Sequence, residues 1–373
     1  MSDELLLTGA TGFVGREVLG RYLERSDRRI IVPVRAADDT AATERVGAIL
    51  QGLFGARARH YQRRVQAFAA DLQQPDLGLR TARREQLAGR VDQIIHSAAS
   101  VSFSLPLDEA RAINVDGTRR VLELAELANA CGTFRCYTQI STAYVAGTHS
   151  GRFHESDHDV GQDFRNAYEQ SKFEAEQLVR SKRELPTMIL RPSIVVGDRR
   201  SGWTAAFNVL YWPLRAFARG LYPAVPAIPS SPVDAVSIDY IADAIYELSR
   251  TNAGIGQTYH LTAGPNTSSV GELVELTSRY FKRPPPRVVP PMEFAQYAKQ
   301  LPEAQKSALR RSAPYFPYFA VSTEFDNAEA RARLEPAQIR TSPLASYLER
   351  LLDFATLSGW GKRPIGRAEA LAA

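Results

Sequence analysis

The sequence predicts an α/β protein with a doubly wound parallel β-sheet and a smaller C-terminal portion. Three observations indicate this fold class. Apolar segments that suit buried strands recur through the first 262 residues, segments with helical periodicity separate them, and the connections are short. Strands and helices that alternate in this way require a parallel sheet with right-handed crossovers and helices on its faces.

The first strand and the turn after it carry the most specific signal. Residues 4–8 form an apolar strand, glycines follow at positions 9, 12 and 15, and the next segment has helical periodicity. In such a unit Gly9 permits a tight turn, Gly12 lets the backbone approach a pyrophosphate, and Gly15 lets the helix pack against the strand. The pyrophosphate then lies at the helix N-terminus. This stretch predicts the start of a Rossmann dinucleotide-binding domain.

The second and third strands suggest which dinucleotide is bound. Residues 29–34 are apolar or β-branched, as in a strand buried on both faces, and the strand ends at Arg35. An acidic residue near this position accepts the ribose 2′-hydroxyl of NAD, whereas an arginine pairs with the extra phosphate of NADP. Arg35 therefore favours NADP(H); the alternative is an exposed structural arginine. Asp71 follows the third strand, residues 65–70, where it can meet the adenine amino group.

The fourth and fifth strands bring further residues to the same edge of the sheet. Residues 91–96 predict the fourth strand, and the small residues at positions 97–99 let the backbone lie close to a cofactor. We expect His96, which closes this strand, to be a structural residue. Residues 135–142 predict the fifth strand, with Ser141 and Thr142 at its end. Ligands of such sheets lie across the carboxyl ends of the strands.

A tyrosine and a lysine on the following helix form a candidate acid-base pair. Tyr168 and Lys172 are four residues apart, so they share one helix face. A tyrosine has an ordinary pKa of ~10, and an adjacent ammonium group favours its anion. The pair is then usable in acid-base chemistry. A surface pair is the alternative, and the glycine turn and the Ser-Thr strand end argue against it.

The remaining chain is less regular. Residues 188–197 predict a sixth strand, 236–248 a helix and 258–261 a further strand, between proline clusters at 223–232 and 284–291. We therefore predict a Rossmann domain of residues 1–198 with 233–263, and a substrate-binding portion of residues 199–232 with 264–373. Within residues 203–222 the spacing predicts an interior helix that lines a pocket. Tyr211 and Leu214 of this helix either line an acyl channel or belong to the core.

Composition excludes several other classes. The 373 residues are 44% hydrophobic, and 46 basic against 41 acidic side chains give a net charge of only +5, so nucleic acid binding is not implied. Cys131 and Cys136 are too few for a disulfide framework and wrongly spaced for a zinc site, and we expect no metal. No segment suits a bilayer span or a signal peptide. We expect a soluble, cytoplasmic protein.

The motifs GATGFVG, ISTAYVAG and Tyr168-x-x-x-Lys172, in this order, resemble the extended short-chain dehydrogenase/reductase superfamily over residues 3–262. The resemblance implies that Thr142 hydrogen-bonds the substrate carbonyl, that Tyr168 donates the proton and that Lys172 holds the nicotinamide ribose. Asn114 is similar to the supporting asparagine of the family. The predicted cofactor-binding residues are Thr8, Gly9, Thr11, Gly12, Phe13, Val14, Gly15, Arg35, Asp71, Leu72, Ser97, Ala98, Ala99, Tyr168, Lys172, Pro192 and Ile194.

Four further runs narrow the subgroup. ADLQQPDLGL, HSAASVSF, YEQSKFEAE and RPSIVVGD resemble the fatty acyl-CoA reductases and the thioester reductase domains of carboxylic acid reductases and peptide synthetases. Ser193 to Val196 replace the aromatic residue and asparagine usual in sugar-nucleotide epimerases, which argues against a sugar substrate. The resemblance implies NADPH-dependent reduction of an acyl thioester, carried by CoA or a carrier protein, to an aldehyde, and with a second hydride to the alcohol.

Two alternatives use the same fold. A dehydrogenase of secondary alcohols or ketones, similar to hydroxysteroid or dihydroflavonol enzymes, would use the same site residues. A nucleotide-sensing protein that has lost the chemistry is the second alternative. The presence of Thr142, Tyr168 and Lys172 together argues against it.

Overall fold

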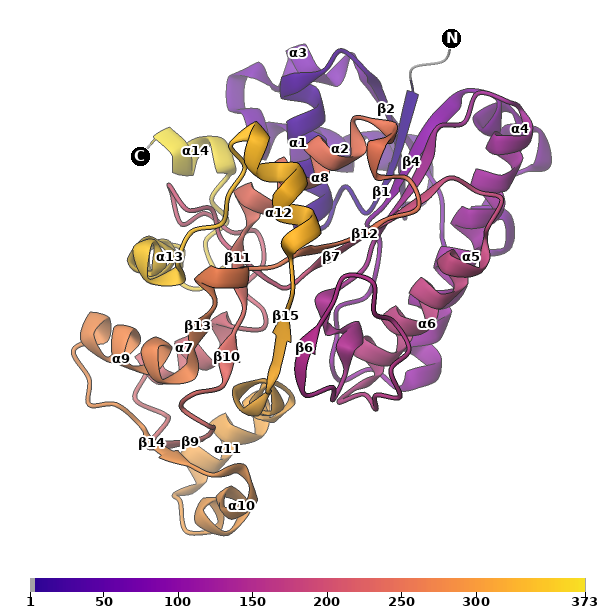
Figure 1. Cartoon of the computed structure of the whole chain (residues 1–373). Helices are drawn as coiled ribbons and strands as arrows, with labels where there is room; N and C mark the ends of the chain where they lie inside the picture. The colour runs from indigo at the N-terminus through magenta and orange to yellow at the C-terminus, as the bar shows by residue number, and fades with distance from the viewer. Residues whose placement is uncertain (1–3, 373) are drawn as a thin grey trace.

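A seven-stranded parallel sheet forms the centre of the molecule (Figure 1). The computed structural model describes residues 4–372, with their side chains except at positions 304 and 308. The strand order is β12-β7-β5-β4-β1-β2-β3, and every neighbouring pair is parallel. The bounds are β1 (Glu4–Thr8), β2 (Arg29–Val34), β3 (Val65–Ala69), β4 (Val91–His96), β5 (Cys136–Ile140), β7 (Thr187–Pro192) and β12 (Thr258–Leu261). The predicted doubly wound α/β fold is confirmed.

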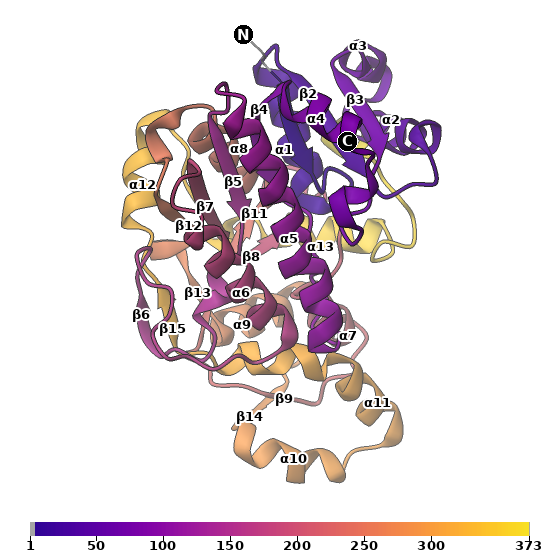
Figure 2. The same ribbon diagram turned by 90° about the vertical axis from the view of Figure 1, so that its right-hand side faces the viewer.

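Helices cover both faces of the sheet. One face carries α1 (Phe13–Arg25), α2 (Asp39–Phe54) and α8 (Ile238–Ser249), and the other carries α4 (Thr81–Ala88), α5 (Leu107–Ala130) and α6 (Ala167–Ser181). Figure 2 shows α5 and α6 side by side across the second face. The chain order reverses between β1 and β4, which lie next to each other. A crevice at such a reversal is where dinucleotides bind in open α/β sheets.

The sixth predicted strand is two strands in the structure. The chain leaves the main sheet after Pro192, and β8 (Ile194–Val196) then pairs with β11 (Ala235–Ser237). Pro192 has no N–H to continue a ladder, and Ser193 separates the two segments. This change of partner directs the chain from the sheet into the smaller portion.

The smaller portion lies below the carboxyl ends of the strands in Figure 1 and has its own apolar core. Two short strand pairs organise it: β9 (Ala224–Pro226) with β14 (Arg287–Val289), and β10 (Pro232–Val233) with β13 (Ser268–Ser269). Its helices are α7 (Tyr211–Ala218), α9 (Val270–Phe281), α10 (Pro291–Lys299), α11 (Glu303–Ser312), the 3-10 segment η6 (Ala313–Ala320) and α13 (Leu348–Leu357). The division into residues 1–198 with 233–263 and 199–232 with 264–373 stays a prediction, and residues 1–3 and 373 lie outside the described part.

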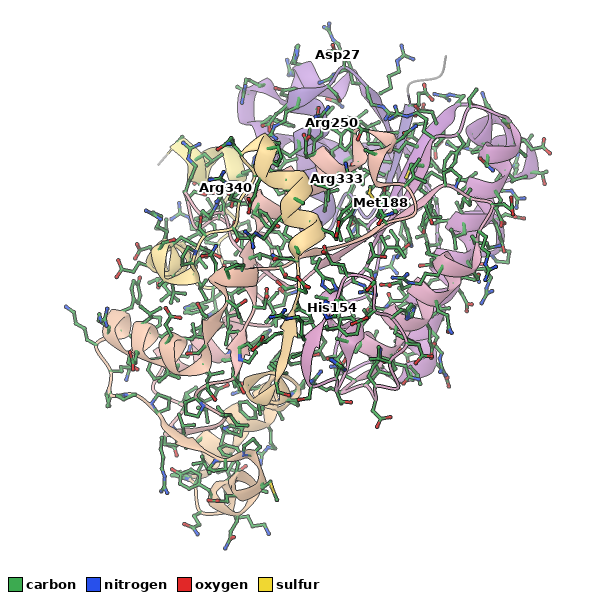
Figure 3. The ribbon with its side chains drawn as sticks, viewed as in Figure 1. Asp27, His154, Met188, Arg250, Arg333 and Arg340 are labelled. Carbon is green, nitrogen blue, oxygen red and sulfur yellow. The ribbon has the colours of Figure 1, made fainter. Side chains whose placement is uncertain are left out.

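Three late segments return to the dinucleotide-binding part. Strand β15 (Thr323–Phe325) pairs with β6 (Gly151–Phe153), and His154, labelled in Figure 3, binds Asp326 at 2.8 Å beside this pair. Helix α12 (Ala328–Leu334) packs on β12 and α8, and α14 (Arg367–Ala372) packs on α2. The two parts of the chain are therefore joined at several places.

The prediction of one helix within residues 203–222 is partly wrong. Only α7 is helical, and residues 203–210 form an irregular segment in which Val209 has a φ of 45°. Pro213 lies in the first turn of α7, where a missing N–H is tolerated. Tyr211 and Leu214 belong to the core of the smaller portion, so the structure favours the core alternative for both. No helix within residues 4–372 combines the length and the apolar character needed to cross a membrane.

Candidate active site

A cavity of about 280 Å³ lies where the carboxyl ends of the strands face the smaller portion. Many of the residues predicted from the sequence line this cavity. The predicted residues that line it are Gly9, Gly12, Phe13, Val14, Gly15, Ser97, Ala99, Thr142, Tyr168, Lys172, Pro192 and Ile194. Segments that are far apart in the chain, from Gly9 to Tyr318, therefore meet around one space.

The glycine turn forms the floor of one end of the cavity. Gly9 has a φ of 73°, and a Cβ atom there would lie 2.6 Å from the backbone nitrogen of Ala98. A Cβ atom on Gly15 would lie 2.2 Å from the carbonyl oxygen of Gly9, so helix α1 could not approach the turn. These contacts account for Gly9 and Gly15 as the sequence predicts.

The start of α1 is open to an anionic ligand. Gly12 is its N-cap residue and supplies no side-chain hydrogen bond, and the first turn has no acidic residue. Phe13 and Val14, whose N–H groups are the first of the helix, line the cavity. A helix N-terminus without a side-chain cap presents free N–H donors and the positive end of the helix dipole. The turn thus fits the pyrophosphate of a dinucleotide.

Thr8 and His96 hold the ends of β1 and β4 together behind the turn. Thr8 Oγ1 lies 2.7 Å from His96 Nδ1 and accepts hydrogen bonds from the backbone N–H groups of Ser97 and Ala98. The other ring nitrogen of His96 lies 3.2 Å from Thr118 Oγ1. Burial, together with the charge of Lys172, lowers the pKa of His96 to about 3. His96 is therefore a neutral residue that braces the strands, away from the cavity lining.

Two hydroxyl groups follow β5, and they have different partners. Ser141 Oγ donates a hydrogen bond to Glu176 Oε2 at 2.8 Å, inside the protein. Thr142 Oγ1 accepts one from the backbone N–H of Tyr144 and donates one to the carbonyl oxygen of Pro192 at 3.3 Å, and it lies close enough to the Tyr168 phenol to influence its pKa. Both residues line the cavity, but only the Thr142 hydroxyl acts on Tyr168. The geometry favours Thr142 as the hydroxyl that faces a substrate.

Tyr168 and Lys172 lie on the first two turns of α6, on the face toward the cavity. Burial raises the pKa of Tyr168 to about 12, and the neighbouring Thr142 hydroxyl offsets this only in part. Burial also lowers the pKa of Lys172 to about 8, although the charge of Glu176 opposes the change. Lys172 Nζ donates a hydrogen bond to the carbonyl oxygen of Ile140 at 2.7 Å.

The expected lowering of the Tyr168 pKa by the ammonium group is therefore wrong for the free protein. Desolvation of the phenol outweighs any effect of Lys172, whose own charged form is disfavoured by burial. Tyr168 consequently keeps its proton at neutral pH. A neutral tyrosine is a hydrogen-bond donor, which suits proton donation better than proton removal.

Asn114 lies behind Tyr168 rather than in the cavity. Its Oδ1 accepts the backbone N–H of Ser100 at 2.8 Å, and its Nδ2 donates to Ser171 Oγ at 2.9 Å. The side chain is 2% exposed. Asn114 thus joins the loop after β4 to helix α6 at Ser171, the residue immediately before Lys172.

Several predicted cofactor residues lie outside the cavity lining. Arg35 is exposed at the carboxyl end of β2, and its carbonyl oxygen accepts a hydrogen bond from Arg45 of α2. Asp71 accepts the N–H of Gln73, and the carbonyl oxygen of Leu72 accepts a hydrogen bond from Arg120. The remaining ones, Thr8, Thr11 and Ala98, lie in or beside the turn. All of them border the carboxyl edge of the sheet, where an adenosine half would lie.

Sequence reasoning missed the residues on the substrate side of the cavity. Among them are Phe103, Tyr144, Asn208, Val209 and Tyr318. Tyr144 lies within the ISTAYVAG run, and Tyr318 lies in APYFPYFA, a cluster of aromatic residues between prolines that could have drawn attention. Asn208 and Val209 carry no sequence signal. Among the residues described, no group of His, Cys, Asp and Glu side chains could hold a metal ion.

Comparison with known proteins agrees with this geometry. An NAD-binding family model described as "Male sterility protein" matches residues 7–245, well over half of the chain. The crystal structure of the terminal R domain from the myxalamid PKS-NRPS biosynthetic pathway superposes with a TM-score of 0.83 at 28% identity. The match covers 97% of this chain and 92% of that domain.

Curated relatives are much longer than this chain. The isonitrile lipopeptide synthase of Streptomyces coeruleorubidus is 31% identical over 253 residues, which are 66% of this chain and 16% of that protein. The carboxylic acid reductase of Segniliparus rugosus is 30% identical over 274 residues, which are 65% of this chain and 23% of that protein. The chain therefore spans under a quarter of the length of either relative.

The family match and the glycine turn identify the cofactor as a nicotinamide dinucleotide. The resemblance predicted from the motifs is confirmed, since the family and the R-domain fold are those expected. The chain belongs to the NAD-binding family described as male sterility protein, and it is an oxidoreductase of the extended short-chain dehydrogenase/reductase type.

Proposed function

We propose that the protein reduces an acyl thioester to an aldehyde with NADPH. The observation that carries the proposal is the similarity to an R domain over almost the whole of both chains, including the smaller portion that closes the cavity. A carboxylic acid reductase is among the curated relatives, and a thiolation-reductase di-domain is among the similar folds. A thioester on a carrier protein is therefore the first candidate substrate, and an acyl-CoA is the second.

The residues around the cavity suit this reaction. The nicotinamide cofactor supplies the hydride when bound. Thr142 and Tyr168 direct their hydroxyl groups at the place where the carbonyl oxygen gains charge, as an oxyanion hole does, and Tyr168 supplies the proton. Lys172 holds the nicotinamide ribose, and Asn114 fixes the loop and helix on which these groups depend. Reduction by one hydride and one proton releases the free thiol and leaves the aldehyde.

The test is a substrate panel with two measurements. Purified protein is given NADPH with acyl-CoAs, with acyl carrier proteins or with ketones, and it is given NADP⁺ with secondary alcohols. Nicotinamide absorbance and free thiol are both followed. We expect NADPH oxidation with thioesters, accompanied by one thiol per aldehyde formed. Turnover of ketones or secondary alcohols, with no thiol released from any thioester, would favour the alternative dehydrogenase and contradict the proposal.

NADP specificity is proposed from the end of β2. Arg35 and Arg45 are exposed, lie next to each other through the 2.9 Å hydrogen bond from Arg45 to the Arg35 carbonyl, and form no ion pair with any described residue. Two guanidinium groups without a carboxylate are suited to the 2′-phosphate of NADP. No carboxylate follows β2 directly to accept the 2′-hydroxyl of NAD.

Replacing Arg35 by Ala is expected to weaken NADPH binding by about 1.5–3 kcal/mol, because one charge-assisted contact is lost. NADH binding should change little, since NADH lacks the phosphate. Dissociation constants of both cofactors, measured by fluorescence titration, check this. Arg29→Ala is the matched control, because Arg29 is an exposed arginine at the opposite end of β2. Equal losses for both cofactors would make Arg35 a structural residue.

A further inference from the structure

The side chain of Tyr318 connects the smaller portion to the helix that carries Tyr168. Tyr318 lies in η6, lines the cavity and is 6% exposed. Its hydroxyl donates a hydrogen bond to Glu169 Oε1 at 2.6 Å and accepts one from Asn166 Nδ2 at 2.8 Å. Both partners belong to the start of α6, about 150 residues earlier in the chain. Hydrogen bonds to a charged acceptor are among the strong ones.

Glu169 needs this donor because its carboxylate is completely buried. Asn166 is the N-cap residue of α6, and its Oδ1 accepts the N–H of Glu169 at 3.0 Å. Glu169 Oε2 in turn accepts the N–H of Arg165 at 2.9 Å, so the two side chains form a variant of the capping box. Arg165 Nη1 is 3.4 Å from Oε1. The Tyr318 hydroxyl is the shortest contact of Oε1 and completes this cap.

A second contact connects the same residues through aromatic rings. Phe103, on the loop after β4, stacks on Tyr318 with ring centroids 5.2 Å apart and contacts Tyr168 with centroids 5.5 Å apart. Tyr144 meets Tyr318 edge to face at 5.1 Å. Tyr318 therefore contacts the surroundings of Tyr168 from two sides, by its hydroxyl at the helix cap and by its ring.

We propose that Tyr318 is a positioning residue for Tyr168, and that the reduction requires η6 to be docked on the start of α6. Tyr168 immediately precedes Glu169 in the first turn, so a cap that loosens displaces its hydroxyl. Small displacements of a reacting group are costly in rate. The inference rests on the proposed function for the thioester, but it applies to any carbonyl that Tyr168 protonates. The smaller portion then supplies part of the active-site geometry besides binding substrate.

The test compares two tyrosines of η6. Tyr318→Phe keeps the ring and removes the hydroxyl, and Tyr315→Phe is the matched control, because the Tyr315 hydroxyl has no hydrogen bond to any described residue. We expect Tyr318→Phe to lower kcat about ten- to a hundredfold. KM for NADPH should stay unchanged, because Tyr318 lies on the substrate side of the cavity. Amide hydrogen exchange should become faster in residues 165–170 only. Tyr315→Phe should change neither quantity.

A double-mutant cycle tests the route through Glu169. Glu169→Gln alone should also lower kcat, and adding Tyr318→Phe to it should cost little more, since both changes act on one hydrogen bond. Losses in the double mutant that equal the sum of the two single losses would overturn the proposal. Tyr318→Phe would also overturn it if amide exchange at the start of α6 were unchanged, or if exchange became faster while kcat stayed the same.

The substrate used in these assays separates this inference from the proposed function. A wild-type protein that reduces ketones but no thioester would overturn the thioester proposal, while the Tyr318 comparison is then made with the ketone. A wild-type protein that reduces neither class would overturn both.

Discussion

Replacing Tyr168 by Phe is expected to lower kcat by about 10²- to 10⁴-fold, the range that a positioned acid or base contributes. The hydroxyl of Tyr168 lies in the cavity beside Thr142 and keeps its proton at neutral pH, because burial raises its pKa to about 12. The ring would keep its contact with Phe103, so the fold should be unaffected. Affinity for NADPH should change little, since Lys172 and the glycine turn remain.

The measurement is kcat by NADPH absorbance, together with the NADPH dissociation constant and the thermal midpoint. Tyr246→Phe is a suitable control, because it removes a tyrosine hydroxyl from α8, where the partner is the carbonyl of Arg25. A near-native kcat for Tyr168→Phe would show that another group donates the proton, and Thr142 would be the next candidate.

The central sheet could be predicted closely because its strands are distinct in the sequence. β1, β2, β4 and β12 begin and end where the apolar runs do. Most residues of these strands are buried, β1 and β2 have continuous apolar centres, and a glycine, an arginine or a small polar residue follows each strand. The glycine turn then fixes the direction of the chain into α1. In this region local sequence and global fold agree.

The route into the smaller portion could not be predicted in the same way. MILRPSIVVG is one continuous strand by sequence, but the chain exchanges β12 for β11 as its partner after Pro192. Partner exchange depends on a strand some 40 residues later and has no local signature. Similarly, the apolar spacing of residues 203–222 predicts one helix, whereas Val209 has a positive φ and interrupts it.

The candidate site likewise has one wall from the Rossmann unit, which could be predicted, and one wall from the smaller portion, which could not. Gly9, Gly12, Thr142, Tyr168 and Lys172 follow strands or lie on helices of the Rossmann unit, and motif spacing was enough to bring them together. The residues of the opposite wall were missed, because η6 and the segment before α7 reach the cavity only through tertiary packing. The Tyr168 pKa also depended on tertiary structure, since desolvation of a phenol cannot be read from its neighbours in the chain.

A buried ion pair near the cavity also could not be predicted from the sequence. Arg191 of β7 and Glu176 of α6 are both fully buried, with Nη2 and Oε1 2.6 Å apart. Glu176 also accepts hydrogen bonds from Arg180 and from Ser141, the neighbour of Thr142. Burial alone would raise the pKa of Glu176, but the charge and hydrogen bonds of Arg191, with Arg180, lower it to about 2.

Glu176→Gln is therefore expected to lower the free energy of unfolding by about 3–5 kcal/mol, because it leaves the buried charge of Arg191 without its carboxylate. The matched control is Glu174→Gln, two residues earlier on α6. Glu174 pairs with Arg111 at the surface, so its loss should cost about 0–1 kcal/mol. Urea unfolding at pH 7 measures both values. Equal midpoints for the two variants would contradict the expected cost of leaving Arg191 without its carboxylate.

The same pair predicts how stability depends on pH. The folded-state pKa of Glu176 is about 2, below the ordinary value of 4.5. A depressed carboxyl pKa contributes stability that is complete above the ordinary value and is lost as the pH falls toward the folded value. Wild-type protein should therefore lose part of its unfolding free energy between pH 4.5 and pH 2, and Glu176→Gln should lose less over that window. If both proteins lose the same amount, Glu176 is not the group that titrates.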